Sequence, residues 1–197
     1  MQELFVPLAV ESFRRDGGRQ PGETRCFSPL ANVTVREARP RLGARDVPLM
    51  AETDIAVVEA VIGSDLYRQS LRLREAILRA PLGLSLTQEE LADDVTRQHF
   101  CAIFQGIAVG TVSLKPFDEA TLQLKQMAVA EDRRRERIGA RLLTHAEVWG
   151  RGAGFRLMVL HARIGADGFY ARFGYLAEGD PFEENTLPHV KMSKPLG

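Results

Sequence analysis

The sequence of 197 residues contains 45% apolar and 26% charged residues, which is typical of a globular protein with one sizeable hydrophobic core. Basic and acidic side chains both number 26, so neither a nucleic-acid partner nor an acidic tail is favoured, and any electrostatic site must be local. The two cysteines, Cys26 and Cys101, are too few for a disulfide framework or a metal cluster.

The N-terminal segment differs from the rest of the chain. It opens with MQELFVPLAVESF, whose acidic leader and short apolar run predict neither a signal peptide nor a membrane span, and we expect a cytoplasmic protein. Residues 1–49 contain eight arginines and no lysine, and they are rich in glycine and proline. This composition predicts an N-terminal extension, which is either a loosely attached arm or the product of a start codon misassigned upstream of Met50. The folded domain is expected at residues 50–197.

The first half of this domain predicts a strand, two helices and three further strands. Ser64 or Asp65 can cap the first helix, and Thr87 with Glu90 forms a capping box for the second. A hairpin turn is expected at Gln105 and the glycine after it. The expected ranges are 55–62 for the first strand, 64–78 and 85–95 for the helices, 99–116 for the two hairpin strands and 120–129 for the last strand.

The second half predicts a long helix, a buried strand, a short helix and a final strand. In the long helix Ile138, Leu142 and Ala146 line one face, whereas Thr144 and Glu147 are expected to face solvent. The segment FRLMVLHA is continuously apolar, which is typical of a strand buried on both faces. The expected ranges are 138–150, 155–162, 165–174 and 189–196. Together the elements predict a mixed α/β protein.

The strand at 120–129 has an irregular apolar pattern. Leu122 and Leu124 share one face, but Met127 and Val129 have the other parity, so the pattern slips by one residue. A β-bulge explains the slip, and so does a strand that passes from half-buried to fully buried. A bulge would leave backbone N–H and C=O groups unpaired and available to a ligand that pairs like a strand.

Four arginines lie within residues 133–137, where the long helix begins. A helix N-terminus carries the positive end of the helix dipole, so cations are mildly unfavourable there. The free N–H groups of its first turn bind anions, phosphate above all, and Gly139 would let such a ligand approach the backbone. The arginines therefore indicate either a bound polyphosphate or a solvated helix start whose charge is offset by Glu131, Asp132 and Glu136.

Two segments resemble motifs of one protein family. MAVAEDRRRERIGARLL resembles the acetyl-CoA-binding motif of the GNAT superfamily of N-acetyltransferases, Gln/Arg-x-x-Gly-x-Gly/Ala at the start of a helix. Arg134 fills its first position and Gly139 its last, whereas Arg137 stands where the first glycine is usual. ARIGADGFYARFGY is similar to the family segment N-x-x-A-x-x-FY-x-x-x-GF, with Arg163 in place of the asparagine. The resemblance extends over residues 55–196.

The resemblance implies a fold and a cosubstrate. The GNAT fold is a central mixed, mostly antiparallel sheet flanked by helices and splayed at the acetyl-CoA-binding strand. Acetyl-CoA would be bound without a metal, its pantetheine arm along residues 127–129 and its pyrophosphate on the amides of residues 134–139. The cofactor-binding residues implied in this way are Met127, Ala128, Val129, Arg134, Arg135, Glu136, Arg137, Ile138, Gly139 and Ala140.

The resemblance also implies a general acid but leaves the base open. Tyr170 has the family's general-acid position, although an aromatic that packs a short helix explains it as well. The strand at 155–162 contains no acidic residue, so His161 at its end and Glu184 are candidate bases. Glu183, His189 and a water relay are further alternatives.

The predicted function is acetyl transfer from acetyl-CoA to a primary amine of a small molecule or peptide. The segments LRLREAIL and FEENTLPHVKM look like those of a subgroup of small single-domain GNATs, most of which have no assigned substrate. The resemblance also implies that the protein forms a homodimer. The loops at 80–86 and 180–188 are expected to select the acceptor. A non-catalytic acyl-CoA-binding module is the alternative. A nucleotide-binding protein is less favoured, because neither a P-loop nor a dinucleotide-binding glycine motif is present.

Overall fold

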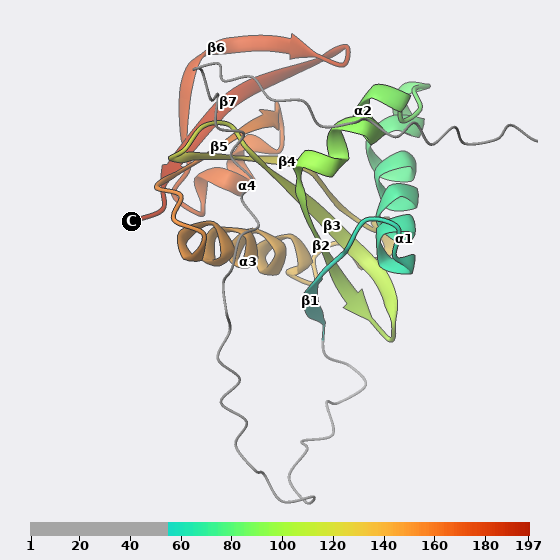
Figure 1. Ribbon diagram of the computed structural model, residues 1–197. Coiled ribbons are helices and arrows are strands. Elements are labelled where there is room, and N and C mark those ends of the chain that lie inside the picture. The colour runs from blue at the N-terminus through green and yellow to red at the C-terminus, as the bar shows by residue number, and fades with distance from the viewer. Residues whose placement is uncertain (1–54) are drawn as a thin grey trace, which may run out of the picture. The chain divides into compact units, whose positions relative to one another are not determined.

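The computed structural model describes residues 55–197 of the chain (Figure 1). The predicted N-terminal extension, 1–49, and the predicted domain start at Met50 lie outside the described residues. Among the described residues, no helix is both long and apolar enough to cross a membrane.

The elements follow the predicted order, with one additional strand near the C-terminus. The strands are β1 (Ala56–Glu59), β2 (Gln98–Phe104), β3 (Ile107–Pro116), β4 (Thr121–Val129), β5 (Leu157–Arg163), β6 (Leu176–Glu184) and β7 (Leu187–Pro195). The α-helices are α1 (Asp65–Arg74), α2 (Gln88–Asp93), α3 (Ile138–Gly152) and α4 (Asp167–Ala171). A π-helical turn (Glu75–Arg79) and 3-10 turns (Ala80–Leu82, Asp94–Thr96 and Glu131–Arg133) connect them. The predicted capping box of Thr87 and Glu90 starts α2.

All seven strands form one mixed sheet in the order β1-β2-β3-β4-β5-β7-β6. Only β4 and β5 run parallel, and they pair over residues 121–124 and 157–160. Beyond Leu124 and Leu160 the register between these two strands ends, although both strands continue. The sheet is therefore split between the C-terminal ends of its two central strands.

The predicted bulge lies on the open edge of this split. Thr111 of β3 faces Ala128, and Ser113 faces Lys125, so two residues of β4 occupy the space opposite one residue of β3. Gln126, one of the two, has a left-handed backbone with φ of 53°. The slip in the apolar pattern is thus a bulge, and not a change in burial along a regular strand. Gln126 and Met127 have no partner residue in the register of either neighbouring strand.

Helices cover both faces of the sheet. Successive strand residues point to opposite faces. Phe100 and Ala102 of β2 belong to the main core together with the buried face of α3, whereas Cys101 between them packs with residues of α1. The main core also contains leucines and methionines of the central strands, of which Leu122, Leu124, Met158 and Leu160 are almost fully buried.

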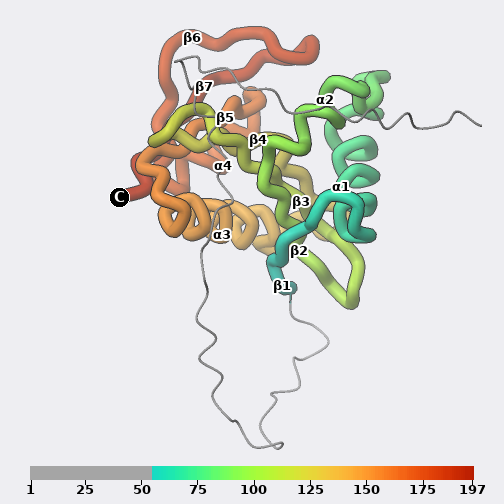
Figure 2. Tube along the Cα trace, in the orientation of Figure 1, coloured from blue at the N-terminus to red at the C-terminus, as the bar shows by residue number. Residues whose placement is uncertain are grey.

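Two sequence expectations about α3 and the C-terminus are wrong. Glu147 does not face solvent: it is 6% exposed and pairs with Lys194 of β7, with 2.7 Å between Oε2 and Nζ. Residues 180–188 are not a loop, because β6 and β7 form a hairpin whose turn is at Asn185 and Thr186 (Figure 2). Most of β6 is exposed on both faces, so it has none of the alternation that identifies a strand in sequence.

Candidate functional site

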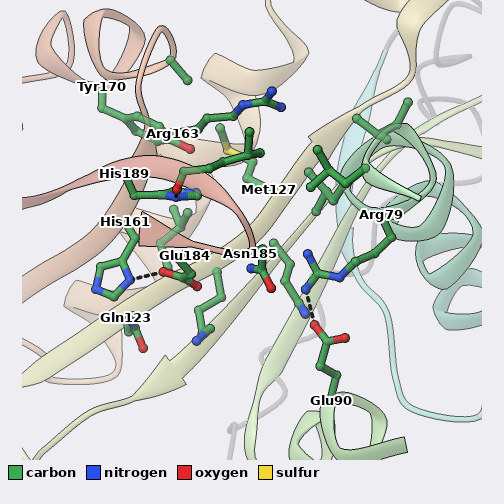
Figure 3. Close-up of a pocket in the computed structure, with 18 of the residues that line it drawn as sticks. Arg79, Glu90, Gln123, Met127, His161, Arg163, Tyr170, Glu184, Asn185 and His189 are labelled. Carbon is green, nitrogen blue, oxygen red and sulfur yellow. Dashed lines mark hydrogen bonds and ion pairs between the residues drawn. The ribbon is translucent and has the colours of Figure 1, made fainter. Parts of the chain in front are cut away.

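A cavity of roughly 530 Å³ lies at the split between β4 and β5 (Figure 3). One wall comes from the two split strands and α4, and the others come from the turns after α1, from α2 and from the tip of the β6–β7 hairpin. The lining residues that carry polar or charged groups are Arg79, Thr87, Glu90, Arg97, Gln123, Lys125, Gln126, His161, Arg163, Tyr170, Glu184, Asn185 and His189. Apolar side chains, among them Ile77, Leu78, Leu82 and Met127, complete the lining.

The structure brings the two predicted bases into contact. Nδ1 of His161, on β5, lies 2.6 Å from Oε2 of Glu184, on β6, and both side chains are about one third exposed, 34% and 36%. A carboxylate accepts a hydrogen bond, so Nδ1 carries the proton and Nε2 is left as the acceptor. The ring edge of Phe182 packs on the imidazole at 4.8 Å between centroids. His161 and Glu184 are therefore one unit rather than two alternatives.

The other two candidate bases are placed differently. His189 lines the cavity, but its Nδ1 lies 2.9 Å from the carbonyl oxygen of Leu187. Glu183 is exposed and is not part of the lining.

Tyr170 projects from α4 into the same cavity (Figure 3). The residue is 9% exposed, and burial raises the pKa of its phenol to about 12. The rings of Phe169 and Tyr175 pack edge-on against it at 5.0 and 5.9 Å. Its hydroxyl makes no hydrogen bond to any other residue between 55 and 197. Tyr170 thus has both properties that the sequence left as alternatives, since it packs its helix and also presents a protonated hydroxyl to the cavity.

A buried side chain fixes the bulge in β4. Nη1 of Arg97 donates to Oε1 of Gln126 at 2.7 Å, and the Arg97 side chain is only 4% exposed. Arg97 is itself fixed by two acids, with 2.5 Å to Asp93 Oδ2 and 3.2 Å to Asp94 Oδ1. Asp94 is fully buried and also pairs with Arg74 of α1. The left-handed residue of the bulge is therefore anchored to the helical layer.

The N-terminus of α3 has an unusual backbone. Arg135 and Arg137 have positive φ values of 73° and 61°, and no side chain caps the helix. A left-handed conformation favours glycine, which is the usual residue at the position of Arg137 in the motif that this segment resembles. Arg133 and Arg134 pair with neighbouring glutamates at 3.2 Å, whereas Arg135 and Arg137 have no acidic partner in the described part of the chain.

Two details of this junction refine the expected phosphate site. The N–H of Arg134 donates to the carbonyl of Glu131 at 3.3 Å, so the free amides begin at Arg135 rather than at Arg134. A Cβ on Gly139 would lie 3.4 Å from Cζ of Phe169, which means that the space beside this glycine is taken up by α4. Gly139 therefore lets α4 approach α3, and its contribution to an anion site is its N–H group.

The junction and the cavity are separate. None of residues 131–140 lines the cavity, and residues 127–129 of β4 connect the two. Met127 reaches the cavity, while Ala128 is buried at 4% exposure and Val129 is partly buried. A ligand that follows this stretch of β4 would have its anionic end at α3 and its other end beside Tyr170 and His161.

Sequence reasoning missed several residues of the cavity. Arg97 and Arg79 gave no signal, because neither belongs to a motif: Arg79 pairs with Glu90 on the next helix, and Arg97 contacts Gln126 on β4. Gln126 was inside the predicted bulge, yet nothing indicated its bond to Arg97. Lys125 and Asn185 lie close in sequence to the predicted site residues Met127 and Glu184, but neither belongs to a sequence motif that indicates a role in a site.

The split mixed sheet agrees with the splayed GNAT fold that the sequence motifs implied. A family profile described as Acetyltransferase (GNAT) family matches residues 65–175, more than half of the chain. The protein therefore belongs to the GNAT family of acetyltransferases, as the sequence motifs predicted.

Two Bacillus subtilis (strain 168) proteins are similar in sequence. One, provisionally named an acetyltransferase, is 25% identical over 64% of this chain and 86% of its own length. The other, the uncharacterized N-acetyltransferase YitI, is 28% identical over 50% of this chain and 70% of its own length.

Solved structures share the fold. A Lactobacillus plantarum protein provisionally named an N-acetyltransferase has a TM-score of 0.65 and 25% identity over 72% of this chain and 98% of its own. A GNAT family acetyltransferase from Elizabethkingia anophelis, with acetyl-CoA bound, has a TM-score of 0.57 and 17% identity over 72% of this chain and 97% of its own. The predicted fold, a mixed and mostly antiparallel sheet that is splayed at β4, is confirmed.

Proposed function

We propose that the protein transfers an acetyl group from acetyl-CoA to a primary amine. The observation that carries this proposal is the cavity at the β4–β5 split, which places Tyr170 and the His161–Glu184 pair around one space. The solved relative with bound acetyl-CoA supports the choice of cosubstrate. When bound, acetyl-CoA supplies an acetyl group that is activated as a thioester.

The residues present fit this cosubstrate. The free amides of residues 135–140, with the exposed guanidinium groups of Arg135 and Arg137, suit a pyrophosphate. The unpaired backbone of Gln126 and Met127 suits the amide groups of a pantetheine arm, because an extended amide-containing chain can pair like a strand. The two sites are connected by β4, so they can bind the two ends of one long molecule.

The chemistry requires one proton donor and one proton acceptor. The nitrogen of the acceptor amine forms a bond to the acetyl carbon, and the bond between that carbon and sulfur breaks. Tyr170 donates its phenolic proton to the leaving sulfur, and the raised pKa keeps that proton in place at neutral pH. The pair of residues His161 and Glu184 takes up the proton that the amine loses, at Nε2 of the imidazole.

Glu184 has a positioning role in this proposal. Its carboxylate selects the tautomer of His161 and stabilises the imidazolium that forms when Nε2 accepts a proton. This arrangement explains how the family chemistry can run on a strand that contains no acidic residue. A direct role of Glu184 as the base is not required.

The test is amine-dependent release of CoA by the purified full-length chain. The protein is incubated with acetyl-CoA and a panel of primary amines, the free thiol is measured, and the acetylated amine is identified by mass spectrometry. We expect thiol and acetylated amine in equal amounts. Acetyl-CoA binding without transfer to any amine of the panel would instead show a non-catalytic acyl-CoA-binding module.

A further inference from the structure

The charges that line the cavity are not balanced. It contains two acidic side chains, and both are engaged, since Glu90 pairs with Arg79 and Glu184 with His161. Two basic side chains of the lining, Lys125 and Arg163, form no ion pair with an acidic side chain among residues 55–197, although the charges of Glu184 and Asp93 act on Lys125. The described lining thus offers cations to a ligand but no free carboxylate.

Lys125 has a distinctive place. The last pair between β4 and β5 joins Leu124 to Leu160, so Lys125 and His161 are the first residues beyond the split on either side. Glu184, which pairs with His161, also acts electrostatically on Lys125, so the three groups lie near one another at the split. Lys125 is partly buried. Burial and, to a smaller extent, the nearby Arg97 lower the pKa of its ammonium group, and the charges of Glu184 and Asp93 offset only part of this effect. A partly buried cation that forms no ion pair among residues 55–197 is stabilised further by a bound anion.

The proposed cosubstrate does not supply this anion. Its phosphates would lie at the N-terminus of α3, and none of residues 131–140 lines the cavity. The pantetheine and acetyl end that reaches the cavity is uncharged. An anion that binds beside Lys125 is therefore expected to belong to the acceptor.

We infer that the acceptor is a primary amine that also carries a carboxylate or a comparable anion, which Lys125 binds beside the split. This inference rests on the proposed acetyl transfer. Arg163, at the end of β5, adds to the positive potential of the same space. Because the amine must reach His161 and the anion Lys125, the two groups of the acceptor are close together, as in an amino acid. Amines with several positive charges are disfavoured, since both acidic side chains of the lining are already paired.

The experiment compares matched acceptors with the full-length protein. Free α-amino acids are compared with their α-carboxamides, and short peptides with an acidic side chain near the N-terminus are compared with their amide counterparts. We expect kcat/KM to be at least about tenfold higher for the carboxylate form in one of the two sets. The set that shows the preference identifies the source of the carboxylate.

Variants of Lys125 assign the preference to this residue. Lys125→Met should raise KM for the carboxylate acceptor about tenfold and leave KM for acetyl-CoA unchanged. Lys125→Arg should keep the preference, and Lys125→Glu should reverse it. Lys191→Met is the control, because Lys191 pairs with Glu178 on β6 and does not line the cavity.

Two outcomes would overturn the inference, and they differ. Equal kcat/KM for carboxylates and carboxamides, with no effect of Lys125→Met, would refute the anionic acceptor while the proposed transfer stands. Absence of transfer to every amine, charged or neutral, would refute the proposed function itself, and the inference would fall with it.

Discussion

The junction between β4 and α3 and the cavity at the split are built in different ways. The junction is one continuous stretch, residues 127–140, and it offers mainly backbone groups to a ligand. The cavity is assembled from strands, helices and turns that are widely separated in the sequence, and it offers side chains. We expect a backbone site to tolerate changes of side chain, such as an arginine at the left-handed position 137, whereas a side-chain site changes its specificity with each residue. One fold can therefore keep a cosubstrate and exchange its acceptors.

Tyr170 provides the strongest test of the side-chain site. Tyr170→Phe removes the proposed proton donor and leaves the ring packing intact, so kcat should fall about 100-fold or more. The affinity for acetyl-CoA, measured by calorimetry, should remain unchanged. Tyr175→Phe is the matched control, because Tyr175 is a buried phenol that donates to Met158 Sδ and does not line the cavity. Equal turnover of wild type and Tyr170→Phe would remove Tyr170 as the acid.

His161 is expected to contribute less, because water can relay a proton in its absence. His161→Gln should lower kcat/KM roughly tenfold near neutral pH. Glu184→Gln should lower kcat/KM to a similar extent, because Nδ1 of His161 loses its carboxylate partner. Equal kcat/KM in wild type and Glu184→Gln would show that the pair does not act as a unit.

Gln126 tests whether the side-chain network controls the backbone site. Gln126→Ala removes the bond from Arg97 and keeps a side chain at the same left-handed position, so the bulge loses its anchor without a new strain. We expect kcat to fall about tenfold through misplacement of the backbone, with a smaller change in KM for acetyl-CoA. Gln98→Ala in β2 is the control, since Gln98 does not line the cavity. Wild-type kcat in Gln126→Ala would mean that the bulge needs no anchor.

Arg137 should show the tolerance of the backbone site. Arg137→Gly relieves a left-handed arginine but adds chain entropy to the unfolded state, so the free energy of unfolding should rise by no more than about 1 kcal/mol. Denaturant unfolding measures this change. Arg151→Gly, in the last turn of α3, should instead lower the stability, by less than about 1 kcal/mol. A clear loss of stability in Arg137→Gly would contradict the interpretation that the left-handed backbone of Arg137 is strained.

The smallest expected effect is a flat response to alkaline pH. Burial disfavours the charged phenolate of Tyr170, raises its pKa to about 12 and so keeps the proton donor intact as the pH rises. Wild-type turnover should therefore not decline between about pH 7 and about pH 10 through loss of the Tyr170 proton. If wild-type turnover did decline with a midpoint below about pH 10, and Tyr170→Phe did not show this decline, the phenol would titrate more easily than its burial indicates.

The two regions also differ in how far the sequence predicted them. The start of α3 and the position of Tyr170 follow from local patterns and a motif, and the structure has both. The pattern in β4 left the bulge as one of two explanations, and the structure shows the bulge. The contact of Arg97 with Gln126 and the position of Lys125 beside the split depend on the tertiary structure, so residue spacing in the sequence does not predict them. The strand β6 was missed because it is exposed on both faces, and the burial of Glu147 was missed because Lys194 neutralises it from a distant strand.

Hydrogen–deuterium exchange of the full-length protein with and without acetyl-CoA tests the central claim most directly, because the claim concerns backbone amides of two connected sites. We expect slower exchange at residues 126–129 and at residues 135–140 when acetyl-CoA is bound, and no change in β2. Protection of α2 or β2 with none at these two segments would contradict the assignment of the split and the α3 start as the acetyl-CoA site.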